Sequence, residues 1–171
     1  LGMGVYVTLR QRGYLASNIR VLTPSGGLSR NTYMGYRIMD EVGPEDRPPD
    51  TDISEQFGTY QVVPNSLVHI QTAILGWAGD VDRLFIYFVD HGAAMDNGLG
   101  GEEGVVFLYT DEARSKSVFL RSSQLKGWLD QWQEPQHRCT VIVEACHSGH
   151  FANELGGGED RRVLASSTPL Q

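Results

Sequence analysis

Residues 140–149, Thr-Val-Ile-Val-Glu-Ala-Cys-His-Ser-Gly, decide the fold of this chain. Their first four residues are apolar or β-branched, which is typical of a strand buried on both faces of a parallel sheet. An acid, a thiol, an imidazole, a hydroxyl group and a glycine follow this strand without a spacer. Open α/β sheets place their reactive groups at the carboxyl ends of strands. The stretch therefore predicts a core strand with a functional site at its end.

A second stretch has the same form. Residues 84–89 read Leu-Phe-Ile-Tyr-Phe-Val, and Asp90, His91 and Gly92 follow directly. One predicted core strand thus ends in a histidine and the other in a cysteine. We expect the rest of the chain to bring His91 and Cys146 together at one edge of a sheet.

The bulk numbers exclude several classes of protein. The 171 residues suffice for one domain that buries roughly 70% of its unfolded surface, and we expect a single domain over residues 1–171. A formal net charge of −7 disfavours binding to nucleic acid or to an anionic membrane. No apolar run approaches the roughly 20 residues of a membrane span, and no signal peptide is visible, so we expect a soluble protein of unknown compartment. Two cysteines make no disulfide framework.

The remaining pattern alternates helices and strands. Helical spacing predicts helices over residues 1–13, from Asn65 or Ser66 to about Ala78, and from Ser122 or Ser123 through Trp132. Strands are predicted over residues 19–22, 84–89, 105–109, 140–143 and 163–166. This alternation predicts an α/β fold, a mostly parallel sheet with helices on both faces. Such a sheet normally begins with a strand before its first helix, so we expect the chain to lack its natural first strand and a C-terminal part.

Two segments show little regular pattern. Residues 25–64 combine prolines with acidic residues and are expected to form a solvated loop. Residues 93–104 are rich in glycine and predict a loose loop beside His91, either substrate-facing or a plain connection. A phosphate-binding loop is excluded there, because Glu102 and Glu103 would repel phosphate.

The histidine and the cysteine suit one chemistry in particular. A cysteine nucleophile needs its thiolate, which a neighbouring imidazole stabilises. Gly149 near Cys146 would let a substrate backbone approach. Cys139 and His137 have no such position and are expected to be structural, and Trp128 and Trp132, one helical turn apart, are expected in the core.

The two motifs resemble those of a known family. Tyr87-Phe88-Val89-Asp90-His91-Gly92 and Glu144-Ala145-Cys146-His147-Ser148-Gly149 are similar to the active-site motifs of caspase-like (clan CD) cysteine peptidases. The closest likeness is to the legumain family, and His147 is a feature shared with metacaspases. His91 precedes Cys146 by 55 residues, comparable with the roughly 50 of caspases. The resemblance covers about residues 1–166.

The resemblance implies a mechanism and its residues. Cys146 would attack the scissile carbonyl to form a thioester, and His91 would protonate the leaving amine and later help to activate water. The N–H groups of Gly92 and Cys146 would form the oxyanion hole. Asp90 is not an obvious orienter of His91, because adjacent strand residues point to opposite faces. In some relatives a residue near the first strand orients the imidazole, and we expect that strand to be missing here, so a third catalytic residue is not named.

The resemblance also places residues at the substrate's P1 side chain. Glu144 would lie at the base of the S1 pocket, where a carboxylate favours Arg, Lys or Asn at P1 and repels Asp. Ser166 matches a serine that helps to line the legumain pocket. The plainer interpretation of Glu144 is that it accepts hydrogen bonds from loop N–H groups, and the choice between P1 Asn and P1 Arg/Lys stays open.

The sequence therefore predicts a cysteine endopeptidase made as a zymogen, acting on peptide or protein substrates without metal or cofactor. A second polypeptide or fragment would complete the domain. Two alternatives remain: a non-catalytic caspase-like binding module, and a zinc-binding protein using Cys146, His147, His150 and His91. The zinc alternative lacks a pair of ligands at the usual spacing.

Overall fold

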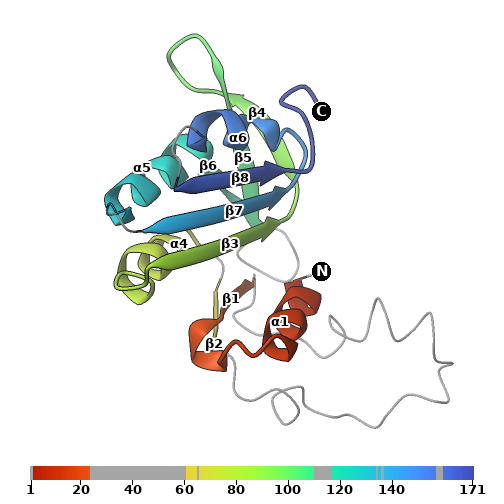
Figure 1. Cartoon of the computed structure of the whole chain (residues 1–171). Helices are drawn as coiled ribbons and strands as arrows, with labels where there is room; N and C mark the ends of the chain where they lie inside the picture. The colour runs from red at the N-terminus through yellow and green to blue at the C-terminus, as the bar shows by residue number, and fades with distance from the viewer. Residues whose placement is uncertain are drawn as a thin grey trace, which may run out of the picture. The chain divides into compact units, whose positions relative to one another are not determined.

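The computed structural model describes residues 2–23, 61–64, 66–109, 117–133, 135, 137–156 and 160–171. The chain divides into two compact units, Leu1–Asn65 and Ser66–Gln171, and each is described by itself. Figure 1 labels the elements of both units.

The first unit holds a helix and two short strands. Helix α1 (Gly2–Gln11) is followed by a 3₁₀ turn, η1 (Ala16–Asn18), and by the parallel strands β1 (Arg20–Thr23) and β2 (Gln61–Pro64). The predicted first helix and the strand at 19–22 are confirmed within one or two residues. Gly13, with a φ of +90°, takes the left-handed conformation expected of glycine just after a helix. The loop predicted over residues 25–64 lies outside the described residues, apart from β2.

The second unit is built on a parallel sheet. Its strands are β3 (Arg83–Val89), β7 (Arg138–Glu144) and β8 (Arg161–Ala165), in the order β3-β7-β8. All three run in the same direction, as their arrowheads in Figure 1 show. The two strands predicted to carry His91 and Cys146 are therefore direct neighbours, and the predicted α/β class is confirmed.

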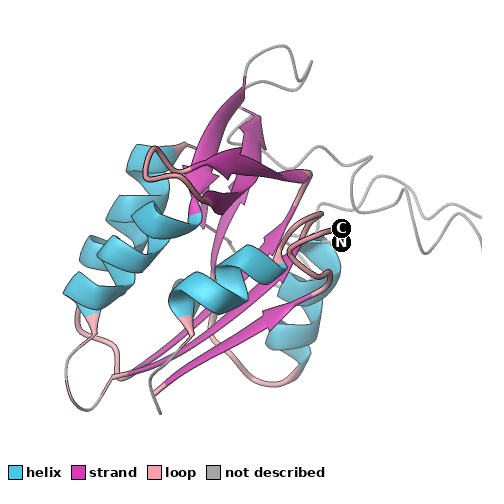
Figure 2. Cartoon of the chain, turned by 90° about the horizontal axis from the view of Figure 1, so that it is seen from above, coloured by secondary structure: helices cyan, strands magenta, loops and turns pink. Residues whose placement is uncertain are grey.

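Helices cover one face of this sheet. They are α4 (Leu67–Thr72) with its π-helical continuation η3 (Ala73–Trp77), α5 (Ser122–Trp132) and α6 (Gly149–Leu155). They contact one another in series, α5 against both η3 and α6, and Figure 2 shows them in cyan along the strands. The connection from β3 to β7, which contains α5, and the connection from β7 to β8, which contains α6, advance across the sheet in the same direction. Right-handed connections therefore place α5 and α6 on the same side of the sheet. This arrangement fully buries Val141 and Val143 of β7.

The other face of the sheet is more open. Phe85 and Leu164 are 48% and 53% exposed, and Tyr87 and Ile142 between them are half-buried. The helices described in this unit thus cover one face, whereas the sequence predicts helices on both. Helix capping follows the sequence in one case: Ser66 caps α4 by accepting a hydrogen bond from His69 N at 3.2 Å. Helix α5 begins at Ser122, one of the two predicted starts, and its N-cap residue is Arg121.

A small antiparallel sheet replaces the expected loose loop after His91. It consists of β4 (Gly92–Asp96), β5 (Glu102–Tyr109) and β6 (Ser117–Arg121), of which only β5 is predicted from the sequence. A tight turn joins β4 to β5, where the Asn97 side-chain oxygen accepts hydrogen bonds from Leu99 N at 2.9 Å and Gly101 N at 3.1 Å. The prediction of a loose segment over 93–104 is therefore wrong, because the glycines build a turn.

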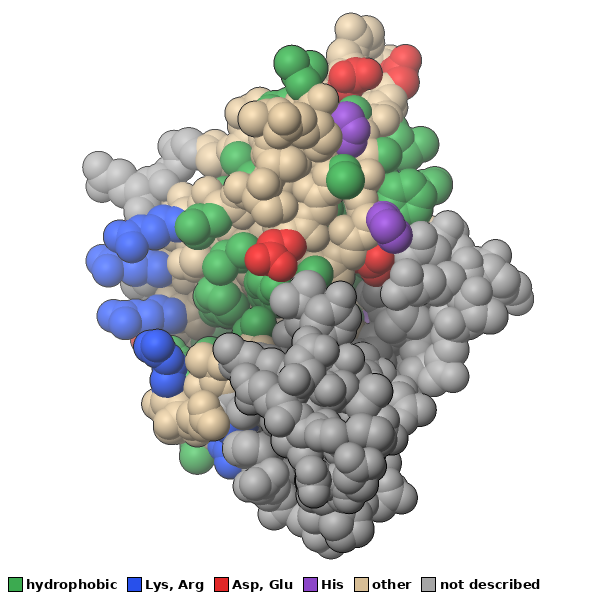
Figure 3. Space-filling model, turned by 90° about the vertical axis from the view of Figure 1, so that its right-hand side faces the viewer, with side chains coloured by type: hydrophobic (Ala, Val, Ile, Leu, Met, Phe, Trp, Pro, Cys, Tyr) green, Lys and Arg blue, Asp and Glu red, His purple; other side chains and the backbone are tan. Residues whose placement is uncertain are grey.

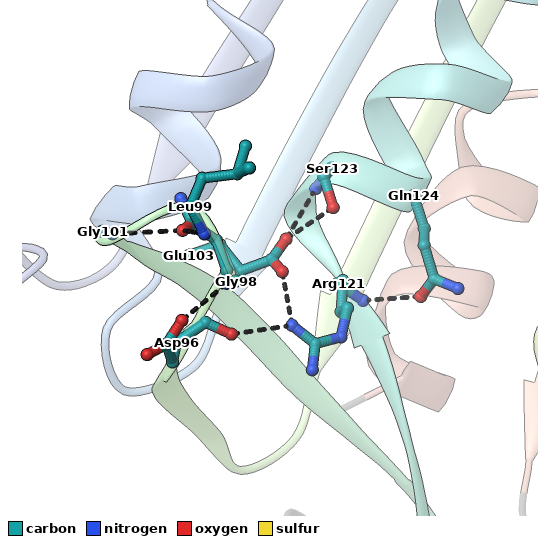
Figure 4. A network of polar contacts seen from close by, with 9 residues as sticks. Asp96, Gly98, Leu99, Gly101, Glu103, Arg121, Ser123 and Gln124 are labelled. Carbon is teal, nitrogen blue, oxygen red and sulfur yellow. Dashed lines mark hydrogen bonds and ion pairs between the residues drawn. The ribbon is translucent and has the colours of Figure 1, made fainter.

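A buried carboxylate ties this sheet to helix α5. Glu103 is 7% exposed and accepts hydrogen bonds from the Arg121 guanidinium, from the Ser123 hydroxyl at 2.5 Å and from Ser123 N at 3.3 Å (Figure 4). Burial raises the pKa of Glu103, but the bonds from Ser123 and Arg121 together outweigh it, so the pKa is lowered overall. The hairpin that begins at Gly92 is thus anchored at its far end.

Candidate active site

His91 and Cys146 lie at equivalent places beyond two neighbouring strands. The register pairs Val89 of β3 with Glu144 of β7, and each motif residue follows its strand by two positions. Neighbouring strands are about 4.8 Å apart. Both side chains are exposed to solvent. The structure therefore brings the two predicted motifs together at the carboxyl edge of the sheet.

Gly92 lies tightly against the cysteine motif. A Cβ atom placed on Gly92 would lie 2.3 Å from the carbonyl oxygen of Cys146 and 2.9 Å from the Cβ of Ala145. No side chain fits in that space, so the backbone after His91 runs directly against the backbone of Cys146. Glycine is required here by close approach, and its φ is not in the left-handed region.

The backbone N–H groups of Gly92 and Cys146, which are expected to form an oxyanion hole, take no part in the backbone hydrogen bonding of the sheets. Phe107 N donates to His91 O at 2.9 Å, which makes Gly92 and Val106 a pair without mutual hydrogen bonds in the β4–β5 ladder. The N–H of Gly92 therefore points away from β5. Cys146 N donates to no group among the described residues. Neither amide therefore has a backbone acceptor among the described residues.

Hydroxyl groups from the end of β8 brace the cysteine loop. Ser166 Oγ accepts a hydrogen bond from Ala145 N at 3.2 Å, and Ser167 Oγ donates to Ala145 O at 3.0 Å. Ser167 Oγ also accepts from Ser148 N at 3.0 Å. Ser166, predicted to line the substrate pocket, therefore lies beside the loop. Ser167 was not predicted, and its only sequence signal is its place just beyond a core strand.

The residue after the cysteine holds a constrained conformation. His147 has a φ of +58°, in the left-handed region, which costs of order 1 kcal/mol for a residue with a side chain. The end of the chain stabilises it, since His147 N donates to Gln171 O and His147 Nδ1 donates to Pro169 O at 2.8 Å. A Cβ on Gly149 would lie 2.4 Å from Pro169 Cδ. This packing fixes the direction in which the chain leaves Cys146.

Glu144 lies on the open face of the sheet and has one strong partner. Tyr87 Oη donates a hydrogen bond to Glu144 Oε2 at 2.6 Å, and both side chains are half-buried. No described cation forms an ion pair with Glu144. Burial, and then the bond and the charge of Glu144, raise the pKa of Tyr87 to about 12. The phenol therefore stays protonated and donating at neutral pH.

Figure 3 views the molecule from the side toward which the strand arrowheads point. Acidic and histidine side chains reach the surface there among hydrophobic ones.

A shallow depression of about 470 Å³ lies elsewhere, lined by Asp82, Arg83, Pro135, Arg138 and Asp160. Arg83 and Arg138 open their strands, so this depression belongs to the amino-terminal edge of the sheet and is separate from the candidate site.

The other predicted residues have plainer roles. Asp90 Oδ1 accepts a hydrogen bond from His91 N at 2.8 Å, so it steadies the backbone of His91. Cys139 is 1% exposed, and burial raises the pKa of its thiol to about 11. His137 is buried and its ring stacks on Trp132, whose indole donates to Ala78 O at 2.6 Å. Trp132 is thus a core residue, as predicted, whereas Trp128 is only half-buried.

Within the described ranges, no three histidine, cysteine, aspartate or glutamate side chains gather closely enough to hold a metal ion. The helices among these residues include none with the length and apolar character of a membrane span.

Comparisons with models of protein families, with curated proteins and with solved structures find no match to this chain.

Proposed function

We propose that this protein is a cysteine endopeptidase of the caspase-like class, with Cys146 as nucleophile and His91 as general acid and base. The observation that carries the proposal is the pairing of β3 with β7 in a register that puts both residues two positions beyond the last pair. The contact of Gly92 with the Cys146 carbonyl supports it.

In the proposed reaction, the Cys146 thiolate adds to the scissile carbonyl. The negative oxygen is bound by the N–H groups of Gly92 and Cys146, which the backbone pairing leaves over. His91 gives a proton to the leaving amine, and a thioester remains. Water, activated by His91, then hydrolyses the thioester and restores the thiol.

The charge of the site favours certain substrates. Glu144 is half-buried and two residues before Cys146, so a P1 side chain placed beside it would gain from positive charge or from amide donors. The proposal includes Arg, Lys or Asn at P1 and disfavours Asp. Ser166, beside the same loop, is proposed to line this pocket.

A set of fluorogenic peptides varied at P1 tests the proposal. We expect cleavage after Arg, Lys or Asn by the wild-type chain, and a loss of at least about 10³-fold in Cys146→Ala. The matched control is Cys139→Ala, which removes the other thiol and should keep cleavage once its folding is confirmed by circular dichroism. Cleavage that survives in Cys146→Ala contradicts the assignment of the nucleophile, and cleavage chiefly after Asp contradicts the role given to Glu144.

A further inference from the structure

The Tyr87–Glu144 hydrogen bond has features that a purely structural bond would not need. It joins two side chains on the more open face of the sheet, at the edge where His91 and Cys146 lie. Glu144 Oε1 has no hydrogen-bond partner among the described residues, whereas Oε2 accepts the bond from Tyr87 Oη at 2.6 Å. One carboxylate oxygen is thus fixed and the other is available.

The register explains how Tyr87 reaches Glu144. Tyr87 is paired with Ile142, and Val89 is paired with Glu144, so all four side chains lie on one face. The long tyrosine side chain spans the diagonal to the next residue of that face on β7. Phenylalanine at position 87 would fill the same space but leave the carboxylate unheld.

The partner's lack of charge is the second feature. An arginine or lysine at position 87 would neutralise Glu144 and remove its attraction for a cationic ligand. A phenol orients the carboxylate and leaves its charge in place. Its pKa of about 12 keeps the donor proton in place at neutral pH.

We infer that Tyr87 is a positioning residue for P1 recognition: its hydroxyl holds the Glu144 carboxylate in the orientation that selects a cationic P1 side chain over a neutral one. The inference rests on the proposed peptidase function and adds a residue and a charge preference to it. It predicts Arg or Lys at P1 over Asn, because a half-buried carboxylate without a cationic partner is best satisfied by a cation.

The test compares three peptides that differ only at P1, carrying arginine, its neutral isostere citrulline, or asparagine. For the wild-type chain, kcat/KM should be highest with arginine. In Tyr87→Phe the arginine-to-citrulline ratio should fall about tenfold, the size of one hydrogen bond to a charged group. The loss should appear as a higher KM for the arginine peptide, with kcat little changed.

Two further variants separate positioning from a structural role. Tyr14→Phe removes a hydroxyl from an exposed tyrosine in the other unit and should change no ratio. In a Glu144→Gln background, Tyr87→Phe should have no further effect on the arginine-to-citrulline ratio, because no charge remains to be oriented. A structural role would instead slow all three peptides equally and lower the melting temperature.

The possible outcomes separate a failure of the inference about Tyr87 from a failure of the proposed peptidase function. Cleavage that depends on Cys146, with an unchanged arginine-to-citrulline ratio in Tyr87→Phe, overturns the inference and leaves the function standing. A wild-type preference for asparagine over arginine also overturns it. If the wild-type chain cleaves no peptide and reacts with no peptide electrophile at Cys146, the proposed function fails and the inference fails with it.

Discussion

Two glutamates in this molecule sit in opposite circumstances. Glu103, in the β4–β6 sheet, is 7% exposed, and its two oxygens accept hydrogen bonds from Arg121 and from Ser123. Glu144, at the end of β7, is half-buried, and the only hydrogen bond to its side chain among the described residues comes from the neutral Tyr87. The first carboxylate has its charge and its lone pairs satisfied within the protein, and the second does not.

The difference extends to the regions around them. In the hairpin region the turn amides donate to the Asn97 side chain, and the Glu103 carboxylate accepts from Arg121 and Ser123 (Figure 4). At the strand ends, two backbone N–H groups, those of Gly92 and Cys146, have no backbone acceptor among the described residues. The Glu144 carboxylate forms no ion pair with a described cation. Polar groups that the fold leaves unpaired are available to a ligand, so we propose that the hairpin region contributes stability and the strand ends contribute binding.

The largest expected effect concerns Gly92 at the strand ends. In Gly92→Ala the new methyl group would meet the Cys146 carbonyl at 2.3 Å, so the backbone that carries the proposed oxyanion donors must shift. We expect kcat/KM to fall by about 10²–10³-fold, the effect of losing one such donor. Steady-state kinetics on the preferred peptide measures it.

Gly127 provides the matched control for Gly92→Ala. It lies inside α5, and a Cβ there would meet nothing within 4 Å. Gly127→Ala should leave kcat/KM unchanged and raise stability by about 0.5–1 kcal/mol, the usual cost of glycine in a helix. Equal activity in the two alanine variants would show that the Gly92 contact has no part in catalysis.

The second-largest effect is expected when the negative charge of Glu144 is removed. Glu144→Gln keeps the shape and can still accept from Tyr87, but it removes the negative charge. We expect the preference for P1 arginine over citrulline to fall by about 100-fold, as for loss of one partner of a desolvated charge pair. Chemical denaturation should show a stability within about 1 kcal/mol of wild type. A large loss of stability with an unchanged preference would make Glu144 a structural residue.

The third effect is expected when the same glutamate-to-glutamine change is made at Glu103. Glu103→Gln weakens the bonds from Arg121 and Ser123, and hydrogen bonds to charged groups contribute about 1.5–3 kcal/mol each. We expect the free energy of unfolding to fall by about 2 kcal/mol, measured in urea, with the P1 preference unchanged. If Glu103→Gln alters the preference as strongly as Glu144→Gln does, the division between the two regions is wrong.

The smallest effect is on the acid stability of the hairpin region. The pKa of Glu103 is lowered in the folded state, so its contribution is present above the pKa of the unfolded chain and is lost as pH falls through the folded pKa. The stability difference between wild type and Glu103→Gln should therefore narrow between neutral pH and about pH 3. Urea denaturation at several pH values measures it, and a difference that widens in acid contradicts the assigned sign.

Sequence patterns predict the parallel sheet well and the hairpin poorly. The runs at 84–89 and 140–143 consist of apolar, aromatic or β-branched residues, which is typical of strands in a parallel sheet. The stretch at 93–104 holds glycines, which suggest a loose loop when taken alone. In the structure Gly98 and Gly100 supply left-handed conformations for a tight turn, with φ of +76° and +84°. Composition does not distinguish a turn from a loose connection.

The same limit applies to the site. The motifs identify His91, Gly92, Glu144 and Cys146, because each follows a recognisable strand. The partner of Glu144 depends on register, which pairs Tyr87 with Ile142 and cannot be derived from either strand by itself. Helix α6, seven residues long and beginning with glycine, offers too little periodicity to be predicted.

The most direct measurement for the central claim compares the reactivities of the two cysteines. Cys146 is exposed beyond a strand next to the one that carries His91, whereas Cys139 is 1% exposed and burial raises its thiol pKa to about 11. A peptide electrophile followed by mass spectrometry should modify Cys146 alone in the native chain, and at least about tenfold more slowly in His91→Ala. Modification of Cys146 at the same rate with and without His91 would contradict the account.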